Sequence, residues 1–283
     1  MKKMFALVLM FAFISVPYAV APAQGPSALY PFSMRYNPDL NLLRVFATPP
    51  GYDRYPEQKM TEFQAWLTNL PLLPSAMPVA LWNGQIVQSY DSVGGVIDLG
   101  VATEQQRDAD IPIQLIMEYL RAAKGLGDYP FIVSPKDTMT FNKWLNGTYA
   151  FDSRMRLIHQ AGPKRDANDD EYYRFMSLVM HFIEGRTLLL NLTPIEEKDI
   201  APGSLYIQFK DDQDSLGHTA VILEVCINPK GEQLLLVGWG GRPARSFAVA
   251  RPFPISDRIW FTAPELKDRL KEYGPGQFYR FKR

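Results

Sequence analysis

A histidine at the start of an apolar strand has the clearest chemical potential in this sequence. His218 follows Gly217 and opens the apolar run 219–223. An imidazole has an unperturbed pKa near neutrality, so a histidine at the mouth of a strand can act as a general acid or base. The alternative is a structural histidine held by hydrogen bonds, and the residue type alone leaves both interpretations open.

The single thiol of the chain is poorly placed to serve that histidine as a nucleophile. Cys226 lies eight residues further along the same predicted strand. At about 3.3 Å per residue, the two positions are about 26 Å apart. We therefore expect Cys226 to be a small core side chain rather than a catalytic group.

The strand that carries His218 is predicted to pair with the apolar run 232–239. If the turn between them is a two-residue loop, the paired residue numbers sum to 459. His218 then faces Gly241, and Trp239 is a diagonal neighbour of His218 on the same face of the hairpin. A bulged loop would reverse this parity. We predict that Trp239, Gly217 and Gly241 line a binding site beside His218.

Asp108, at the predicted start of a helix, is the second candidate for acid–base chemistry. A capping box that begins at Thr103 would place Pro112 in the helix interior, where proline breaks a hydrogen bond and clashes with the preceding turn. A start at Asp108 or Asp110 leaves Pro112 in the first turn, where it is tolerated. It also puts carboxylates at the end of the helix that favours negative charge. We therefore prefer this later start.

The composition excludes several classes of protein. Thirty basic and thirty acidic residues balance, so the chain lacks the basic footprint of a nucleic-acid-binding protein. One cysteine and three histidines argue against a Cys-rich or His-rich metal site. The acidic run 166–170 has Glu171 where a calcium loop needs glycine, and the run 238–241 lacks the Lys-Ser/Thr ending of a phosphate loop. We expect no metal, no cofactor and no nucleic-acid partner.

The first 23 residues have the layout of a secretory signal peptide. Lys2 and Lys3 precede the apolar run 4–16, and small residues allow cleavage after Ala23. The apolar run is too short to span a bilayer core of about 30 Å, and no later run reaches the roughly 18 apolar residues of a transmembrane helix. We expect a periplasmic or secreted protein with no membrane span after signal cleavage.

The rest of the pattern predicts a mixture of helices and strands without βαβ regularity, which is typical of an α+β fold. Residues 24–48 are interpreted as a lead-in segment with a short strand at 43–47, and residues 49–283 as one domain. The apolar spacing predicts helices near 60–70, 140–146, 172–183 and 262–273. Strands are predicted at 79–82, 85–90, 93–101, 204–209 and 277–281.

Several short motifs, in their order and spacing, resemble a bacterial family, the domain of unknown function 4846 family. The resemblance runs from about Pro49 to the C-terminus. The motifs are Pro50-Gly51-Tyr52, Phe63-x-x-Trp66-Leu67, Leu70-Pro71-Leu72, Val96-Ile97-Asp98, Glu118-Tyr119-Leu120, Trp144, Pro202-Gly203 and Gly217-His218-Thr219-Ala220-Val221-Ile222.

More distantly, the chain resembles the papain-like NlpC/P60 and CHAP domains, which often act on cell-wall peptides. The resemblance implies an antiparallel sheet with packed helices, here with an N-terminal extension. In that group a cysteine begins a helix, a histidine opens a strand, and a polar residue on the next strand orients the histidine. His218 matches the histidine, whereas Asp108 stands at the cysteine position and Trp239 at the orienting position. The long separation between Asp108 and His218 implies an insertion.

These replacements favour a domain without peptidase chemistry. A carboxylate cannot simply replace a thiolate in peptide cleavage, and an indole N–H donates but does not accept. The resemblance then implies an exported, non-catalytic domain that binds peptidoglycan peptides or an envelope protein. The alternative is a hydrolase of altered chemistry in which Asp108 and His218 form an acid–base pair, in direct or one-water contact. A structural envelope protein without a ligand is the third possibility.

Overall fold

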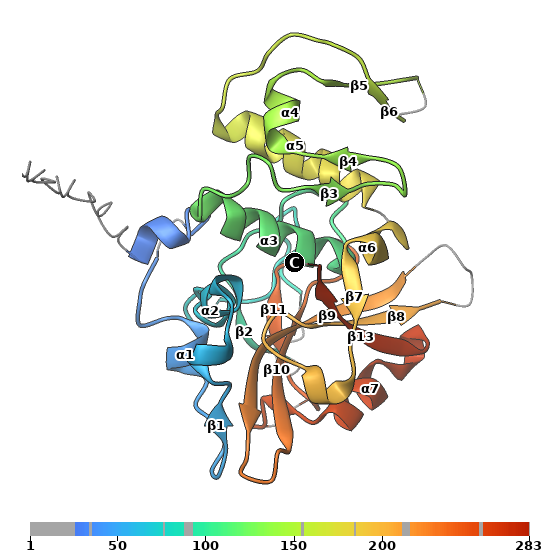
Figure 1. Ribbon diagram of the computed structural model, residues 1–283. Helices are drawn as coiled ribbons and strands as arrows, with labels where there is room; N and C mark the ends of the chain where they lie inside the picture. The colour runs from blue at the N-terminus through green and yellow to red at the C-terminus, as the bar shows by residue number, and fades with distance from the viewer. Residues whose placement is uncertain are drawn as a thin grey trace, which may run out of the picture.

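The fold is described from a computed structural model, drawn in Figure 1. It describes residues 26–33, 36–75, 77–87, 93–153, 156–183, 185–210, 216–254 and 257–282. The predicted signal peptide, residues 1–23, lies outside the described residues. Export and cleavage after Ala23 therefore stay predictions.

A large antiparallel sheet occupies the lower half of Figure 1. Its strands follow the order β2-β11-β10-β9-β8-β13-β7, with β1 beside β9 and β12 beside β10. Each pairing is antiparallel, which together with the helices confirms the predicted α+β class. The strands are β1 Asp53–Arg54, β2 Val93–Val96, β7 Leu192–Pro194, β8 Leu205–Phe209, β9 Leu216–Ile227, β10 Gln233–Trp239, β11 Ala248–Ala250, β12 Trp260–Phe261 and β13 Gly276–Phe281.

Alternate residues of the central strands enter two different cores, as the two-residue period of a strand requires. Val221 and Leu223 of β9 belong to the core that includes residues of α2 and α3. Ala220 and Ile222 belong to the core that includes residues of α7. These helices are α2 Glu62–Thr68, α3 Ile111–Ala122 and α7 Ala263–Leu270. None of the helices among the described residues combines the length and the apolar character that crossing a membrane requires.

The segment between α3 and β7 begins with two small hairpins and two helices. These lie above α3 in Figure 1, on the side away from the large sheet. Helix α5 of this segment contacts α3. The elements are β3 Phe131–Ile132, β4 Thr138–Met139, α4 Phe141–Leu145, β5 Tyr149–Phe151, β6 Leu157–His159 and α5 Asp169–Phe182, and α6 Thr187–Leu190 then leads back to the sheet.

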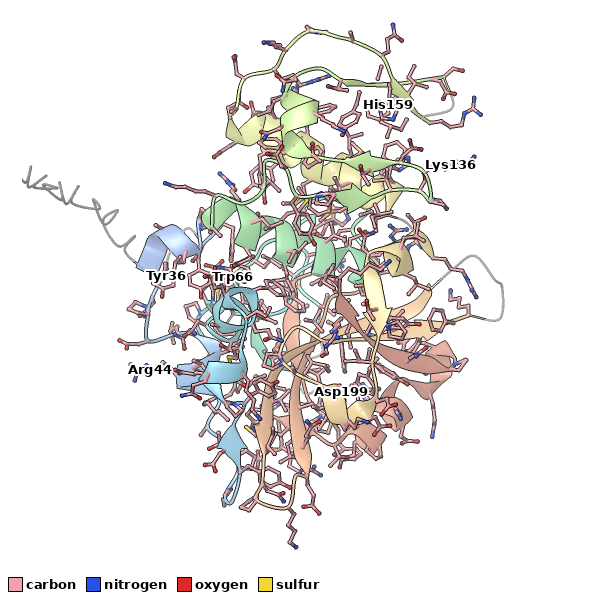
Figure 2. The ribbon with its side chains drawn as sticks, in the orientation of Figure 1. Tyr36, Arg44, Trp66, Lys136, His159 and Asp199 are labelled. Atoms are coloured by element: carbon pink, nitrogen blue, oxygen red, sulfur yellow. The ribbon has the colours of Figure 1, made fainter. Side chains whose placement is uncertain are left out.

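The lead-in segment packs onto the body of the protein. Tyr30 is 3% exposed, and its hydroxyl donates a hydrogen bond to the carbonyl of Trp66. The Tyr30 ring lies between the stacked rings of Tyr36 and Trp66, the two residues labelled together in Figure 2. The predicted strand at 43–47 is wrong: α1 spans Leu42–Val45, because the Asn41 side chain caps this turn by accepting from the N–H of Arg44.

Two other predicted strands are shorter than expected. The strand predicted at 93–101 covers only Val93–Val96, since Gly100 takes a positive φ in a turn. In the hairpin predicted at 79–90, Ala80 and Ile86 form an isolated bridge, and residues 88–90 lie outside the described residues. Short 3₁₀ turns complete the fold: η1 Pro26–Leu29, η2 Glu57–Lys59, η4 Asp108–Asp110, η5 Glu197–Asp199 and η6 Lys271–Tyr273.

Candidate functional site

The start of α3 is built as the proline argument predicted. Asp108 lies in the 3₁₀ turn η4, and Pro112 falls in the first turn of the α-helix, where its missing N–H leaves no bond unmade. The turn is fixed by Arg107 and Asp110: one Asp110 oxygen accepts from the backbone N–H of Arg107 at 2.8 Å, and the other pairs with its guanidinium at 2.9 Å. This arrangement holds Asp108 at the N-terminal end of the helix.

Asp108 and His218, which are 110 positions apart in the sequence, contact each other directly. The Oδ2 atom of Asp108 pairs with Nδ1 of His218 and also accepts from the N–H of Thr219 at 3.0 Å. Its Oδ1 accepts from the N–H of Ala109, also at 3.0 Å. The structure therefore brings the Asp108 helix start into contact with the strand that carries His218.

The carboxyl of Asp108 is held in its charged form. Burial by itself would raise its pKa. The hydrogen bond and the charge interaction with His218, together with the N–H donors of Thr219 and Ala109, outweigh burial and bring the pKa below its usual range. Because an ionised carboxylate only accepts hydrogen bonds, Nδ1 of His218 carries the hydrogen in this pair.

The ring of His218 is enclosed by two aromatic side chains. Tyr273 of η6 stacks on it, with 5.0 Å between ring centroids, and Trp239 meets it edge to face at 5.5 Å. The side chain of His218 is only 9% exposed, and its Nε2 atom is buried without a hydrogen-bond partner among the described residues. Among the described residues, the arrangement is a closed Asp–His pair with no open approach to the free nitrogen.

The contact between Trp239 and His218 was predicted. It arises because two departures from the simple hairpin, a longer turn and a bulge, shift the strand pairing in opposite directions and cancel. Near the turn the paired numbers sum to 460, because the N–H of Asn228 bonds to Glu232 in a turn one residue longer than expected. Leu223 is then an extra residue in β9, a β-bulge that restores the sum of 459 at Gly238 and Val221. The parity at the site is therefore the predicted one.

The two predicted binding glycines serve close packing in this structure. A Cβ on Gly217 would lie 2.1 Å from the carbonyl oxygen of Tyr273, so glycine is required for η6 to approach β9. Gly241 is buried after the end of β10, where a Cβ would overlap the guanidinium of Arg245. Gly217 therefore helps to close the cover over His218, and the binding role of both glycines stays a prediction.

Other sequence candidates have structural explanations. Cys226 is buried in the middle of the sheet, opposite Arg54 and Leu234, and burial raises the pKa of its thiol to about 12. In the acidic run 166–170, Asn168 caps α5 by accepting from the N–H of Glu171. Within the described ranges, no group of three or more His, Cys, Asp or Glu side chains is placed to hold a metal ion.

The model of one protein family, described as a domain of unknown function (4846), matches residues 42–281. The chain belongs to this family. No curated protein and no solved structure matches the chain. The family description carries no activity, so what this member of the domain of unknown function 4846 family does must be argued from its own geometry.

Two features of this family member were missed from the sequence. The first is Tyr273, whose ring covers His218 from a segment 55 positions away and with no local pattern to mark it. The second is a pair of cavities. One, of about 720 Å³, is lined by Arg107 and Arg242, the immediate neighbours of Asp108 and Gly241. The other, of about 520 Å³, lies between α2, the middle of α3, residues 198–204 and the chain end at 280–282.

Proposed function

We propose that this chain is an exported, non-catalytic domain of papain-like architecture that binds a peptidoglycan peptide or another component of the cell envelope. The observation that carries the proposal is the closed pair of Asp108 and His218. A carboxylate occupies the helix start, and the free nitrogen of the histidine is buried beneath Tyr273 and Trp239. Such a pair links the helix to the sheet rather than presenting a reactive group.

Three chemical arguments speak against peptidase activity at this place. A carboxylate bound by three donors is a poor nucleophile and cannot form the good leaving group that a thiolate provides. Trp239 offers only an N–H donor where the papain-like pattern has an acceptor, so it cannot orient His218 as that residue does. Within the described residues, Nε2 of His218 has no hydrogen-bond partner. Cys226, buried on β9 with a raised pKa, cannot supply the missing thiolate.

A hydrolase of altered chemistry is the second candidate, and one observation favours it. The direct bond between Asp108 and His218 fulfils the contact that an acid–base pair requires. In that case Nε2 would have to reach the substrate or a water molecule. The side chain of His218 is only 9% exposed, which counts against the hydrolase because the substrate could enter only if Tyr273 moved. We therefore favour the binding function.

The test combines capture with a cleavage assay on the mature protein. Isolated cell-wall sacculi and envelope extract should retain the protein, while muropeptides incubated with it should stay intact by mass spectrometry. His218→Ala is the control variant. Cleavage that disappears in His218→Ala would overturn the non-catalytic proposal and favour the Asp108–His218 hydrolase. Absence of both capture and cleavage would leave a structural protein as the better account.

A further inference from the structure

The cavity of about 520 Å³ beside α3 has the character of a ligand site, and it lies away from the Asp108–His218 pair. It is called here the Phe63 groove. Its walls include Phe63, Tyr119, Lys59, Gly203, Arg280 and Phe281. In Figure 1 the chain end, marked C, lies beside α3 at this place. Tyr119 is eleven residues along from Asp108, about 16 Å at the rise of a helix.

The floor of the groove is an aromatic cluster that is only partly buried. Phe63 meets Tyr119 edge to face at 5.3 Å and Phe281 at 6.5 Å. All three rings pack against the main core while keeping part of their surface open. Gly203 takes a positive φ beside the Phe63 ring, where a Cβ would come within 3.2 Å, so the 202–203 turn forms a close wall. Such a floor suits the apolar part of a ligand.

The rim of the groove is basic in a chain whose overall charge is zero. Lys59, Arg280 and Lys282 are exposed on it, and within the described residues neither Lys59 nor Arg280 forms an ion pair. Lys198 is already paired with Glu196 at 2.7 Å. Asp199 is the acidic residue of the lining, and Figure 2 shows it in front of the sheet. Glu62 accepts from the hydroxyl of Tyr119 at 3.3 Å and adds a second carboxylate beside Asp199. Lys59, Arg280 and Lys282 still give the rim a surplus of positive charge, which is complementary to carboxylates.

The size and shape of the groove favour a short peptide. A second hollow of about 450 Å³ shares Lys198, Asp199 and Arg280 with it, so the lined surface continues toward β7. A volume of this order accommodates a ligand of roughly four amino-acid residues. A nucleic acid would also combine negative charge with stacking, but it needs a more extended basic surface than these few cations provide.

We infer that the Phe63 groove binds a short acidic peptide, with its apolar side chains on the aromatic floor and its carboxylates at Lys59 and Arg280. This inference rests on the proposed binding function and names the place and the chemistry of the ligand. Both cations are exposed, so each contact is modest and salt-dependent, and the affinity depends on their acting together with the rings.

The test uses isothermal titration calorimetry with two N-acetylated peptides, Ala-Glu-Leu-Glu and its uncharged counterpart Ala-Gln-Leu-Gln. The native protein should bind the glutamate peptide, and the glutamine peptide about tenfold more weakly. The double variant Lys59→Glu/Arg280→Glu should weaken binding of the glutamate peptide by at least about tenfold. Lys136→Glu is the matched control and should change nothing, because Lys136, labelled in Figure 2, is exposed on the segment between α3 and β7.

Four results would overturn the inference. These are no binding of the glutamate peptide, equal binding of both peptides, unchanged binding in the groove variant, or tighter binding of a thymidine oligonucleotide. Circular dichroism checks that the variants fold. If Lys59→Glu/Arg280→Glu does not fold, the neutral double variant Lys59→Gln/Arg280→Gln takes its place. The sacculus capture is repeated with the groove variant. If sacculi captured the native protein but the protein bound neither peptide, the proposed function would stand and this inference alone would fail.

Discussion

Replacing Asp108 with alanine tests whether the buried pair is a structural link. The substitution removes the acceptor of three donors: Nδ1 of His218 and the backbone N–H groups of Thr219 and Ala109. His218 and Thr219 are 7% and 1% exposed, so water cannot readily replace the lost bonds. A buried donor left without a partner costs about 1–3 kcal/mol, and here more than one donor loses its partner.

Summed over these donors, we expect Asp108→Ala to lower the free energy of unfolding by about 3–5 kcal/mol. Asp108→Asn keeps the shape and one acceptor oxygen, so its cost should be smaller, about 1–2 kcal/mol. Urea unfolding followed by circular dichroism measures both at pH 7. A double-mutant cycle with His218→Ala isolates the pair, and its coupling energy should account for much of the Asp108→Ala loss.

The pH dependence of the same variants has a defined sign. The pKa of Asp108 in the folded protein lies below its usual value, so the unfolded chain binds the proton more readily. The stabilisation is present above the ordinary carboxyl pKa and is lost as the pH falls through the folded-state value. The difference in the free energy of unfolding between the native protein and Asp108→Ala should therefore become smaller in acid. A cost below about 1 kcal/mol at pH 7, or a gap that widens in acid, would refute the structural reading of the pair.

Three further predictions rest on the burial of side chains, and a fourth rests on the predicted signal peptide. Tyr273→Ala should let diethyl pyrocarbonate modify His218, which in the native protein should stay protected while the two exposed histidines react; equal protection in both proteins contradicts the cover. Burial raises the pKa of Glu118 to about 7, so stability should fall by up to about 3 kcal/mol between pH 4.5 and 7, and Glu118→Gln should remove that decline in urea titrations. The Cys226 thiol should react with Ellman's reagent only after unfolding. If the folded protein reacted as fast as the protein unfolded in urea, the result would count against the burial of Cys226. Protein recovered from the periplasm should have the intact mass of a chain processed after Ala23.

The helix start and its partner strand could be predicted from the sequence because each depends on local rules. Pro112 is tolerated only in a first turn, and that restriction placed Asp108 at the helix end. The strand from His218 to Cys226 is continuous and apolar, so its hairpin partner was evident. The register was right at Trp239 although the turn and the bulge at Leu223 each shift it by one residue. Local sequence does not reveal such cancelling shifts.

The features that were not predicted depend on contacts between distant segments. A short, mostly apolar segment such as Leu42–Val45 fits a strand as well as a helix, and the Asn41 side-chain cap decides between them. Tyr273 covers His218 because Gln208 donates to the carbonyls of Leu270 and Gly274 on either side of η6. The Phe63 groove is assembled from several separate segments, and only the tertiary fold brings them together.

The pair at the helix start and the proposed groove are linked through α3. Asp108 ties the beginning of this helix to β9, and Tyr119, further along the same helix, forms part of the groove wall. A covalent nucleophile at that start would have to stay exposed, whereas a structural carboxylate gains by being buried among three donors. The closed geometry therefore suits a protein that uses α3 as a rigid wall. On the proposed function, the residues that resemble a catalytic pair position the binding surface, and Tyr119 of the proposed groove lies about three helical turns further along the chain.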